Sequence, residues 1–244
     1  ATLARELVAR NGSEREKRHV ETLALAIEGQ LPAALASTLK HLEAFPRDAI
    51  VMSLPMGAFV LFAFSGRADP DQARVDLCGR YAHHYGDDWW YLYNHGWALV
   101  ENNDLARGRA MIERAFAVRE ANANAVHGLL HAMFEDGSVD EGDALVDRWI
   151  PRYDRSGILH GHIRWHQALG ALEHGDAARA LEIYAEVLQP SVTRAPPLNA
   201  ITDGASLLWR LQVYGHAVPE ELWNAADAYA QTAQVDEDDD FDFL

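Results

Sequence analysis

Residues 89–108 read WWYLYNHGWALVENNDLARG and describe a helix, a turn and the start of a second helix. Aromatic and aliphatic side chains recur at helical spacing from Trp89 to Val100. A polar turn, Asn102-Asn103-Asp104, follows them, and the small residue Gly108 comes at the start of the next helical segment. This stretch therefore predicts two short helices packed as a hairpin.

The same pattern recurs along the chain, which indicates internal repeats. Similar turns lie at residues 29–32, 66–70, 137–140 and 175–177, and a small residue follows each turn. The small residues are separated by 39, 35, 34 and 38 positions, close to the period of about 34 of tetratricopeptide repeats. We therefore predict an all-α fold, a right-handed α-α superhelix (a tetratricopeptide-like solenoid) of about five to six helical hairpins. The small residues are Ala34, Ala73, Gly108, Gly142 and Ala180.

Composition agrees with a helical globular chain. The 244 residues are 49% hydrophobic, enough for a sizeable core or an extended repeat array. Ala and Leu are abundant, and β-branched residues are sparse, which favours helix. We expect one tetratricopeptide-like domain over residues 1–234. Residues 235–244 are mostly acidic and are expected to form a disordered tail.

Charge and cysteine content exclude several classes of partner. The formal net charge of −16 argues against a nucleic acid or an anionic membrane as partner, because both need a cationic face. No stretch approaches 18 uninterrupted apolar residues, so no membrane span is expected. Cys78 is the single cysteine, which excludes an internal disulfide and a cysteine-based zinc site. A cytoplasmic location is expected from these features.

A histidine and aromatic groove is the predicted binding site. Helical-repeat arrays present concave binding surfaces, and in tetratricopeptide units the first helix of each hairpin lines that surface. When the units are numbered from their small residues, eight residues fall on positions that face the groove. The predicted ligand-binding residues are Trp90, Tyr93, Trp97, His127, His131, His162, Trp165 and His166.

Two histidine pairs carry the chemistry of this groove. Residues four apart lie one above the other on a helix, so His127 and His131 point the same way. His162 and His166 do the same on the next first helix. Neighbouring helices pack about 8–10 Å apart, so the four imidazoles are candidate ligands of a divalent metal, the one candidate cofactor. The other interpretations are protonated imidazoles that grip an anion, acid/base groups, and hydrogen bonding within an inter-helix layer.

Three residues are candidate catalytic groups: His131, His166 and Asp203. The zinc-protease motif is excluded, because Gly128 stands where that motif has Glu. Asp203 is placed at the start of the last long helix. It is interpreted either as a helix cap or first-turn acid, or as a carboxylate that meets the histidines. His160 is expected to be exposed where its helix begins.

Several short motifs also resemble one family. The segments 14–20, 28–30, 45–49, 125–131, 162–169 and 207–212 resemble the tetratricopeptide-repeat protein 38 family, in the same order along the chain. The resemblance implies an α-helical repeat fold, with the two histidine pairs matching histidines of the family, and His95 and Asp203 matching as well. Family members usually continue beyond this length with further repeats, and Met133 and Phe134 replace a further histidine and an acid.

These observations predict a binding protein. Its concave groove would hold a small molecule or a short peptide between histidine anchors and aromatic walls. One alternative is an enzyme that uses the histidines as metal ligands or as general acid and base. A second alternative is a protein-protein interaction scaffold with buried histidines. The open ends of a solenoid favour self-association, so a homodimer is a further expected assembly.

Overall fold

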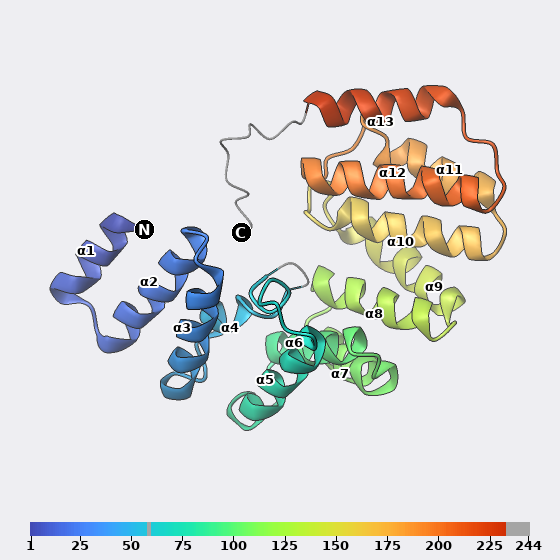
Figure 1. Ribbon diagram of the computed structural model, residues 1–244. Coiled ribbons are helices and arrows are strands. Elements are labelled where there is room, and N and C mark those ends of the chain that lie inside the picture. The colour runs from blue at the N-terminus through green and yellow to red at the C-terminus, as the bar shows by residue number, and fades with distance from the viewer. Residues whose placement is uncertain (58–59, 233–244) are drawn as a thin grey trace. The chain divides into compact units, whose positions relative to one another are not determined.

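Every regular element in the described part of the chain is helical. The computed structural model describes residues 1–57 and 60–232 (Figure 1), and over these residues it contains helices and turns without strands. The predicted all-α fold class is confirmed. The predicted acidic tail lies outside the described residues. No helix among those described is both long and apolar enough to cross a membrane.

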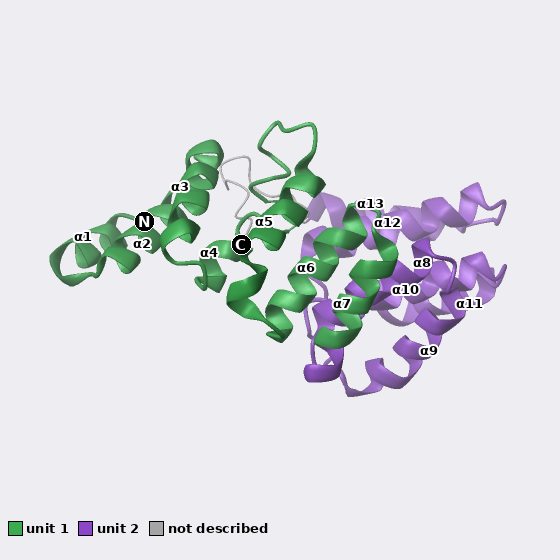
Figure 2. Cartoon of the chain, turned by 90° about the horizontal axis from the view of Figure 1, so that it is seen from below, with its two compact units in different colours: residues 1–115, 240–244 green, residues 116–239 purple. Residues whose placement is uncertain are grey.

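The chain divides into two compact units (Figure 2). Unit 1 holds the described residues up to Ala115, and unit 2 holds those from Phe116 onward. The expectation of one domain over residues 1–234 stays a prediction.

Unit 1 contains two well-formed hairpins and one incomplete hairpin. α2 pairs with α3, and α6 pairs with α7, as the turns at 29–32 and 102–105 predict. Before the turn at 66–70 the structure has only the five-residue α4, because Pro55 interrupts the helical pattern two residues after α4 ends. The helices of unit 1 are α1 (Thr2–Asn11), α2 (Glu14–Ile27), α3 (Leu31–Ala44), α4 (Ala49–Ser53), α5 (Pro70–Tyr85), α6 (Trp89–Glu101) and α7 (Leu105–Val118), whose last residues belong to unit 2.

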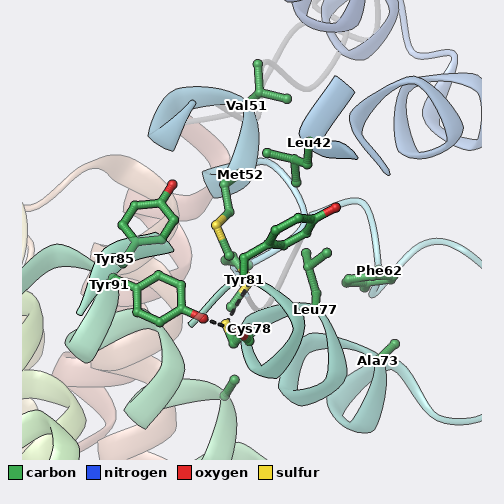
Figure 3. Packing of buried hydrophobic residues seen from close by; sticks show 12 residues of the cluster. Leu42, Val51, Met52, Phe62, Ala73, Leu77, Cys78, Tyr81, Tyr85 and Tyr91 are labelled. Carbon is green, nitrogen blue, oxygen red and sulfur yellow. Dashed lines mark hydrogen bonds between the residues drawn. The ribbon is translucent and has the colours of Figure 1, made fainter. Parts of the chain in front are cut away.

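The core of unit 1 gathers where α3, α4, α5 and α6 meet (Figure 3). Cys78 and Met52 are fully buried there, and the Sγ of Cys78 lies 3.8 Å from the sulfur of Met56. The Tyr91 hydroxyl donates a hydrogen bond to the backbone carbonyl of Cys78. Burial raises the pKa of the Cys78 thiol, which keeps the thiol protonated and unreactive.

Unit 2 is built from three successive hairpins. Its core is formed by apolar residues of α10, α11, α12 and the π-helical turn η2. α10 packs against α8, α9, α11 and α12, so it is the central helix of the unit. The elements are α8 (Ala123–Glu135), α9 (Val139–Trp149), η1 (Ile150–Arg152), α10 (His160–Glu173), α11 (Ala177–Ile183), η2 (Tyr184–Leu188), α12 (Pro197–Val213) and α13 (Glu220–Thr232).

Local sequence signals account for the helix ends. Ser13 and Glu16 form a capping box at the start of α2. Asp88 accepts hydrogen bonds from the backbone amides of Trp90 and Tyr91, and so caps α6. The turn that follows α8 needs a backbone φ of +82° at Gly137, a conformation that other residues rarely adopt. These signals fix where each hairpin turns.

Gly96 and Gly108 allow the closest approach between α6 and α7. A Cβ atom added at Gly108 would lie 2.7 Å from the Gly96 carbonyl oxygen and 2.8 Å from the Val100 backbone nitrogen. A Cβ added at Gly96 would lie 2.8 Å from the Gly108 carbonyl oxygen. The repeat pattern therefore places small residues where two backbones touch.

Gly108→Ala is expected to lower the free energy of unfolding by about 1–3 kcal/mol, because α6 and α7 must move apart to admit the methyl group. Gly79→Ala on α5 is the matched control, since nothing lies within 4 Å of its added Cβ. The control should change stability by less than about 1 kcal/mol, in the stabilising direction, through helix propensity. Urea unfolding followed by circular dichroism measures both. Equal stability of the two variants would contradict the close packing.

Candidate functional site

The two predicted histidine pairs lie on adjacent helices of unit 2. α8 carries His127 and His131, and α10 carries His162 and His166. Each pair is spaced four residues apart, so both rings of a pair lie on one face of their helix. α8 and α10 are in contact, and they bring the four imidazoles together. His162 and His131 are half-buried, so solvent reaches part of the cluster.

The ring nitrogens converge on one point. His131 Nε2 lies 3.0 Å from His127 Nε2, and His162 Nε2 lies 3.1 Å from the same atom. One nitrogen from each of the four rings lies within 4.8 Å of the others. A tetrahedral ion bound at about 2.0–2.1 Å holds its ligand nitrogens about 3.4 Å apart. The four rings are therefore close to the spacing of a four-histidine metal site.

Hydrogen bonds alone satisfy this arrangement poorly. An imidazole nitrogen carries either one hydrogen or one lone pair, yet His127 Nε2 faces two other imidazole nitrogens at hydrogen-bond distance. A single proton shared by two acceptors satisfies each contact only in part. His166 Nε2 is buried and has no hydrogen-bond partner among the described residues. A cation at the centre would accept a lone pair from each ring.

Asp203 fixes the orientation of His162. Both carboxylate oxygens of Asp203 lie near His162 Nδ1, at 3.0 and 2.9 Å. A carboxylate only accepts, so Nδ1 carries the hydrogen and the Nε2 lone pair of His162 points at the cluster. Histidine ligands of metals commonly have such a partner. Asp203 is buried within α12, and α13 follows, so the expectation that it starts the last long helix is wrong.

Trp165 on α10 covers one side of His162, and Arg210 on α12 lies over Trp165. The Trp165 ring stacks on His162 with centroids 5.2 Å apart and planes 13° apart, and the Arg210 guanidinium lies 5.4 Å from the Trp165 ring centre.

Burial, with smaller effects of His131 and His162, holds the pKa of His127 well below its ordinary value. Burial likewise depresses the pKa of His166. These two imidazoles are neutral at pH 7, the form in which histidine binds metals.

Three of the four predicted aromatic residues of the groove lie in unit 1. Trp97 is only 7% exposed, and His95 is buried on the same helix, α6. Trp90 is half-buried and packs against the unit 1 core, with its ring centre 5.9 Å from that of Tyr85. Burial raises the pKa of the Tyr93 hydroxyl. The fourth predicted aromatic residue, Trp165, lies in unit 2 and contacts His162 and His166.

A second histidine cluster was not singled out from the sequence. Asp48 caps α4 and is buried, and its Oδ2 lies 2.9 Å from His19 Nδ1 and 3.0 Å from His41 Nε2. These three groups are close enough to hold a cation. However, Arg15 Nη2 lies 2.9 Å from the same Oδ2 and already supplies the positive charge. We interpret this set as an internal ion pair that ties α2, α3 and α4 together. The sequence indicates this cluster only weakly. His19 and Asp48 lie within segments 14–20 and 45–49, which resemble the family, but the two residues are far apart along the chain.

Comparisons with known proteins support the repeat fold. No family model matches the chain. Cellulose synthase 2 operon protein C of Komagataeibacter xylinus is 30% identical over 151 residues, which are 60% of this chain. The match spans 11% of that relative's length. The crystal structure of a tetratricopeptide repeat protein from Parabacteroides merdae ATCC 43184 is similar with a TM-score of 0.66 and 13% identity, over 96% of this chain and 85% of that one. This likeness confirms the helical-repeat fold.

Asp48→Asn is expected to lower the free energy of unfolding at pH 7 by about 3 kcal/mol, because Arg15 and two imidazoles lose a buried charged acceptor. Burial alone would raise the pKa of Asp48, but hydrogen bonds from His19 and His41 outweigh it and hold that pKa below its usual range. The stability that ionised Asp48 contributes is therefore complete above its unfolded pKa of about 3.9. It is lost as the pH falls from there through the lower pKa of the folded state, so wild type and variant should become equally stable in acid.

Urea unfolding at pH 7 and at lower pH values measures this difference. Asp76→Asn on α5 is the control, since Asp76 is exposed and, among the described residues, accepts a hydrogen bond only from Gln72; it should shift stability by less than about 0.5 kcal/mol. A loss at Asp48 no larger than that of the control would show that the cluster contributes little.

Proposed function

We propose that this chain is a helical-repeat binding protein whose four-histidine site holds one divalent transition-metal ion. His127, His131, His162 and His166 would be the ligands, and Asp203 would orient His162. The observation that carries the proposal is the convergence of four ring nitrogens within 4.8 Å on two adjacent helices. One of those nitrogens is buried without a hydrogen-bond partner among the described residues. Buried polar groups are ordinarily satisfied, so a cation accounts for the arrangement better than hydrogen bonds do.

The ligand set favours particular ions. Imidazole suits Zn²⁺, Cu²⁺, Ni²⁺ and iron, whereas Mg²⁺ and Ca²⁺ prefer oxygen ligands. Four protein ligands at tetrahedral spacing are typical of zinc. Catalytic zinc sites usually have three protein ligands and keep one position for water. The geometry therefore supports binding rather than catalysis, and the alternative of an enzyme is less well supported by the same four rings.

A bound ion would join two repeats. Two ligands come from the hairpin α8–α9 and two from the hairpin α10–α11. Because an ion that binds only the folded state stabilises it, the ion would fix the spacing of the two first helices. In tetratricopeptide arrays those helices form the binding surface. The ion would thus set the shape of a surface for a short peptide, a protein segment or a small molecule.

The proposal also covers the family, the location and the oligomeric state of the protein. The histidine motifs at 127–131 and 162–166 support membership of the tetratricopeptide-repeat protein 38 family. The single cysteine, Cys78, is buried and reduced, which suits a cytoplasmic location. A homodimer remains a further proposal, supported only by the tendency of open repeat ends to associate.

The metal content of the protein tests the proposal directly. Protein purified without a nickel column should contain one divalent ion per chain by inductively coupled plasma mass spectrometry. The double variant His131→Ala/His166→Ala should contain close to none, because half of the ligands are gone. Far-ultraviolet circular dichroism checks that the variant is still helical.

The control for this experiment is His83→Ala/His84→Ala. These two histidines lie in the last turn of α5 in unit 1, where their rings contact each other, and neither belongs to the four-histidine set. The control should keep its ion. Wild-type protein that takes up no divalent ion from a zinc, copper or nickel solution would rule out the metal site.

Asp203→Asn should weaken metal binding by about 10–100-fold, because His162 loses the carboxylate that orients its ring and strengthens it as a ligand. Competition with a chromogenic chelator gives the affinity. Asp227→Asn is the control, since Asp227 is exposed on α13 and its one side-chain hydrogen bond within the described part of the chain comes from Gln231. If both variants bind the ion equally well, Asp203 has no part in the site.

A further inference from the structure

A cavity lies where α10 begins, and its lining is rich in hydrogen-bond donors. Its volume is about 540 Å³, within the range of about 300–1,000 Å³ of small-molecule sites. It is bounded by η1, the loop before α10, the first turns of α10, and the π-helical turn η2. π-Helical turns occur frequently at functional sites. The lining residues are Ile150, Pro151, Tyr153, Arg155, His160, Arg164, Glu186 and Val187.

Positive charge exceeds negative charge in this cavity. Arg155 and Arg164 both line it, against one carboxylate, that of Glu186. Arg155 donates from Nη2 to the Glu186 backbone carbonyl at 2.9 Å, which holds its side chain along the wall. Arg164 Nη2 lies 2.6 Å from the Glu186 carboxylate. In a chain of net charge −16, two guanidinium groups facing one cavity favour an anionic ligand.

His160 adds a donor that the protein itself leaves unused. The expectation that His160 is exposed is wrong: it is 7% exposed, because the loop before α10 folds over it and the Tyr153 ring stacks on it at 6.2 Å. Its ring nitrogens make no hydrogen bond to another described residue, and they are not among the fully buried polar atoms, so water reaches them from the cavity. A ligand in the cavity would supply the missing partner.

The amino end of α10 adds to the positive electrostatic potential in the cavity. α10 is 14 residues long and starts at His160 without a side-chain cap, so its first backbone N–H groups are not bonded to a capping side chain. The amino end of a helix carries partial positive charge and binds anions readily. Burial depresses the pKa of His160, and the nearby Arg155 and Arg164 add to the shift. The positive charge of Arg155 and Arg164 therefore acts on His160, which lines the cavity.

The rest of the lining is apolar or aromatic. Ile150, Pro151 and Val187 offer hydrocarbon surface, and Tyr153 offers a ring. A ligand that fits both parts has one charged end and an apolar body. We propose that this cavity binds a small organic oxyanion, a carboxylate or phosphate monoester, whose charged end contacts Arg155, Arg164 and His160.

Glu186 has a specific part in this proposal. Its carboxylate pairs with Arg164, so it competes with the ligand for that guanidinium. An oxyanion in the cavity would displace the carboxylate, which is more than half exposed and therefore free to turn into solvent. Removing its charge should therefore tighten binding, the reverse of removing an arginine.

Isothermal titration calorimetry of the full chain tests the proposal with three probes. Benzoate and phenyl phosphate carry the charged end and an apolar ring, and benzyl alcohol carries the ring alone. Ionic strength is held constant with sodium chloride. We expect both oxyanions to bind with one site per chain and benzyl alcohol to give no measurable heat. Stronger binding of phenyl phosphate would indicate a phosphate ester as the natural ligand, and stronger binding of benzoate a carboxylate.

Three variants locate the binding. Arg155→Gln should weaken the preferred oxyanion by about tenfold or more, because one charged hydrogen bond is lost. Glu186→Gln should tighten it several-fold. Arg148→Gln is the control: Arg148 is exposed on α9 and does not line the cavity, and its affinity should stay within about twofold of wild type.

Amide chemical shifts on oxyanion binding should change in the segments 150–164 and 186–187. The proposal is overturned if benzyl alcohol binds as tightly as benzoate, or if Arg155→Gln and Arg148→Gln weaken binding equally. It is also overturned if Glu186→Gln weakens binding. These outcomes are independent of the four-histidine site, because His162 and His166 do not line this cavity.

Discussion

The contact between α8 and α10 is the constraint on which the site depends. Each helix carries histidine at two positions four residues apart, and the repeat packs both faces against each other. Four imidazoles are thereby held in one space, with His127 Nε2 3.0 and 3.1 Å from two other ring nitrogens. Hydrogen bonding satisfies such a set only in part, and Asp203 turns the lone pair of His162 toward it. The packing of one hairpin against the next therefore also builds an arrangement suited to a cation.

α10 carries chemistry on two sides. His162 and His166 face α8, while His160 and Arg164 face the cavity at the start of the helix. Residues two apart point in nearly opposite directions on a helix, so one helix serves two sites. α10 also packs against α8, α9, α11 and α12. A central, well-packed helix positions both sets of side chains more rigidly than a loop would.

The sequence predicted the repeats and the histidine pairs, and it failed where tertiary contacts decide. Turn residues and small residues such as Gly108 mark each hairpin, because a positive φ and a close backbone approach restrict the residues allowed there. The i, i+4 spacing places each pair on one face. Asp48 with His19 and His41 was missed, because the three come from different helices with no shared period. The expectation that His160 is exposed was wrong, because no residue pattern in the preceding loop predicts that the loop packs on it. The short α4 shows that one proline outweighs a repeat signal.

The central claim is that His127, His131, His162 and His166 together bind one metal ion. X-ray absorption at the zinc edge of the zinc-loaded chain measures the ligand shell itself. Four nitrogen ligands at about 2.0–2.1 Å, with the multiple scattering typical of imidazole rings, are the predicted result. A shell dominated by oxygen, or one that is the same after the four histidines are replaced, would contradict the account.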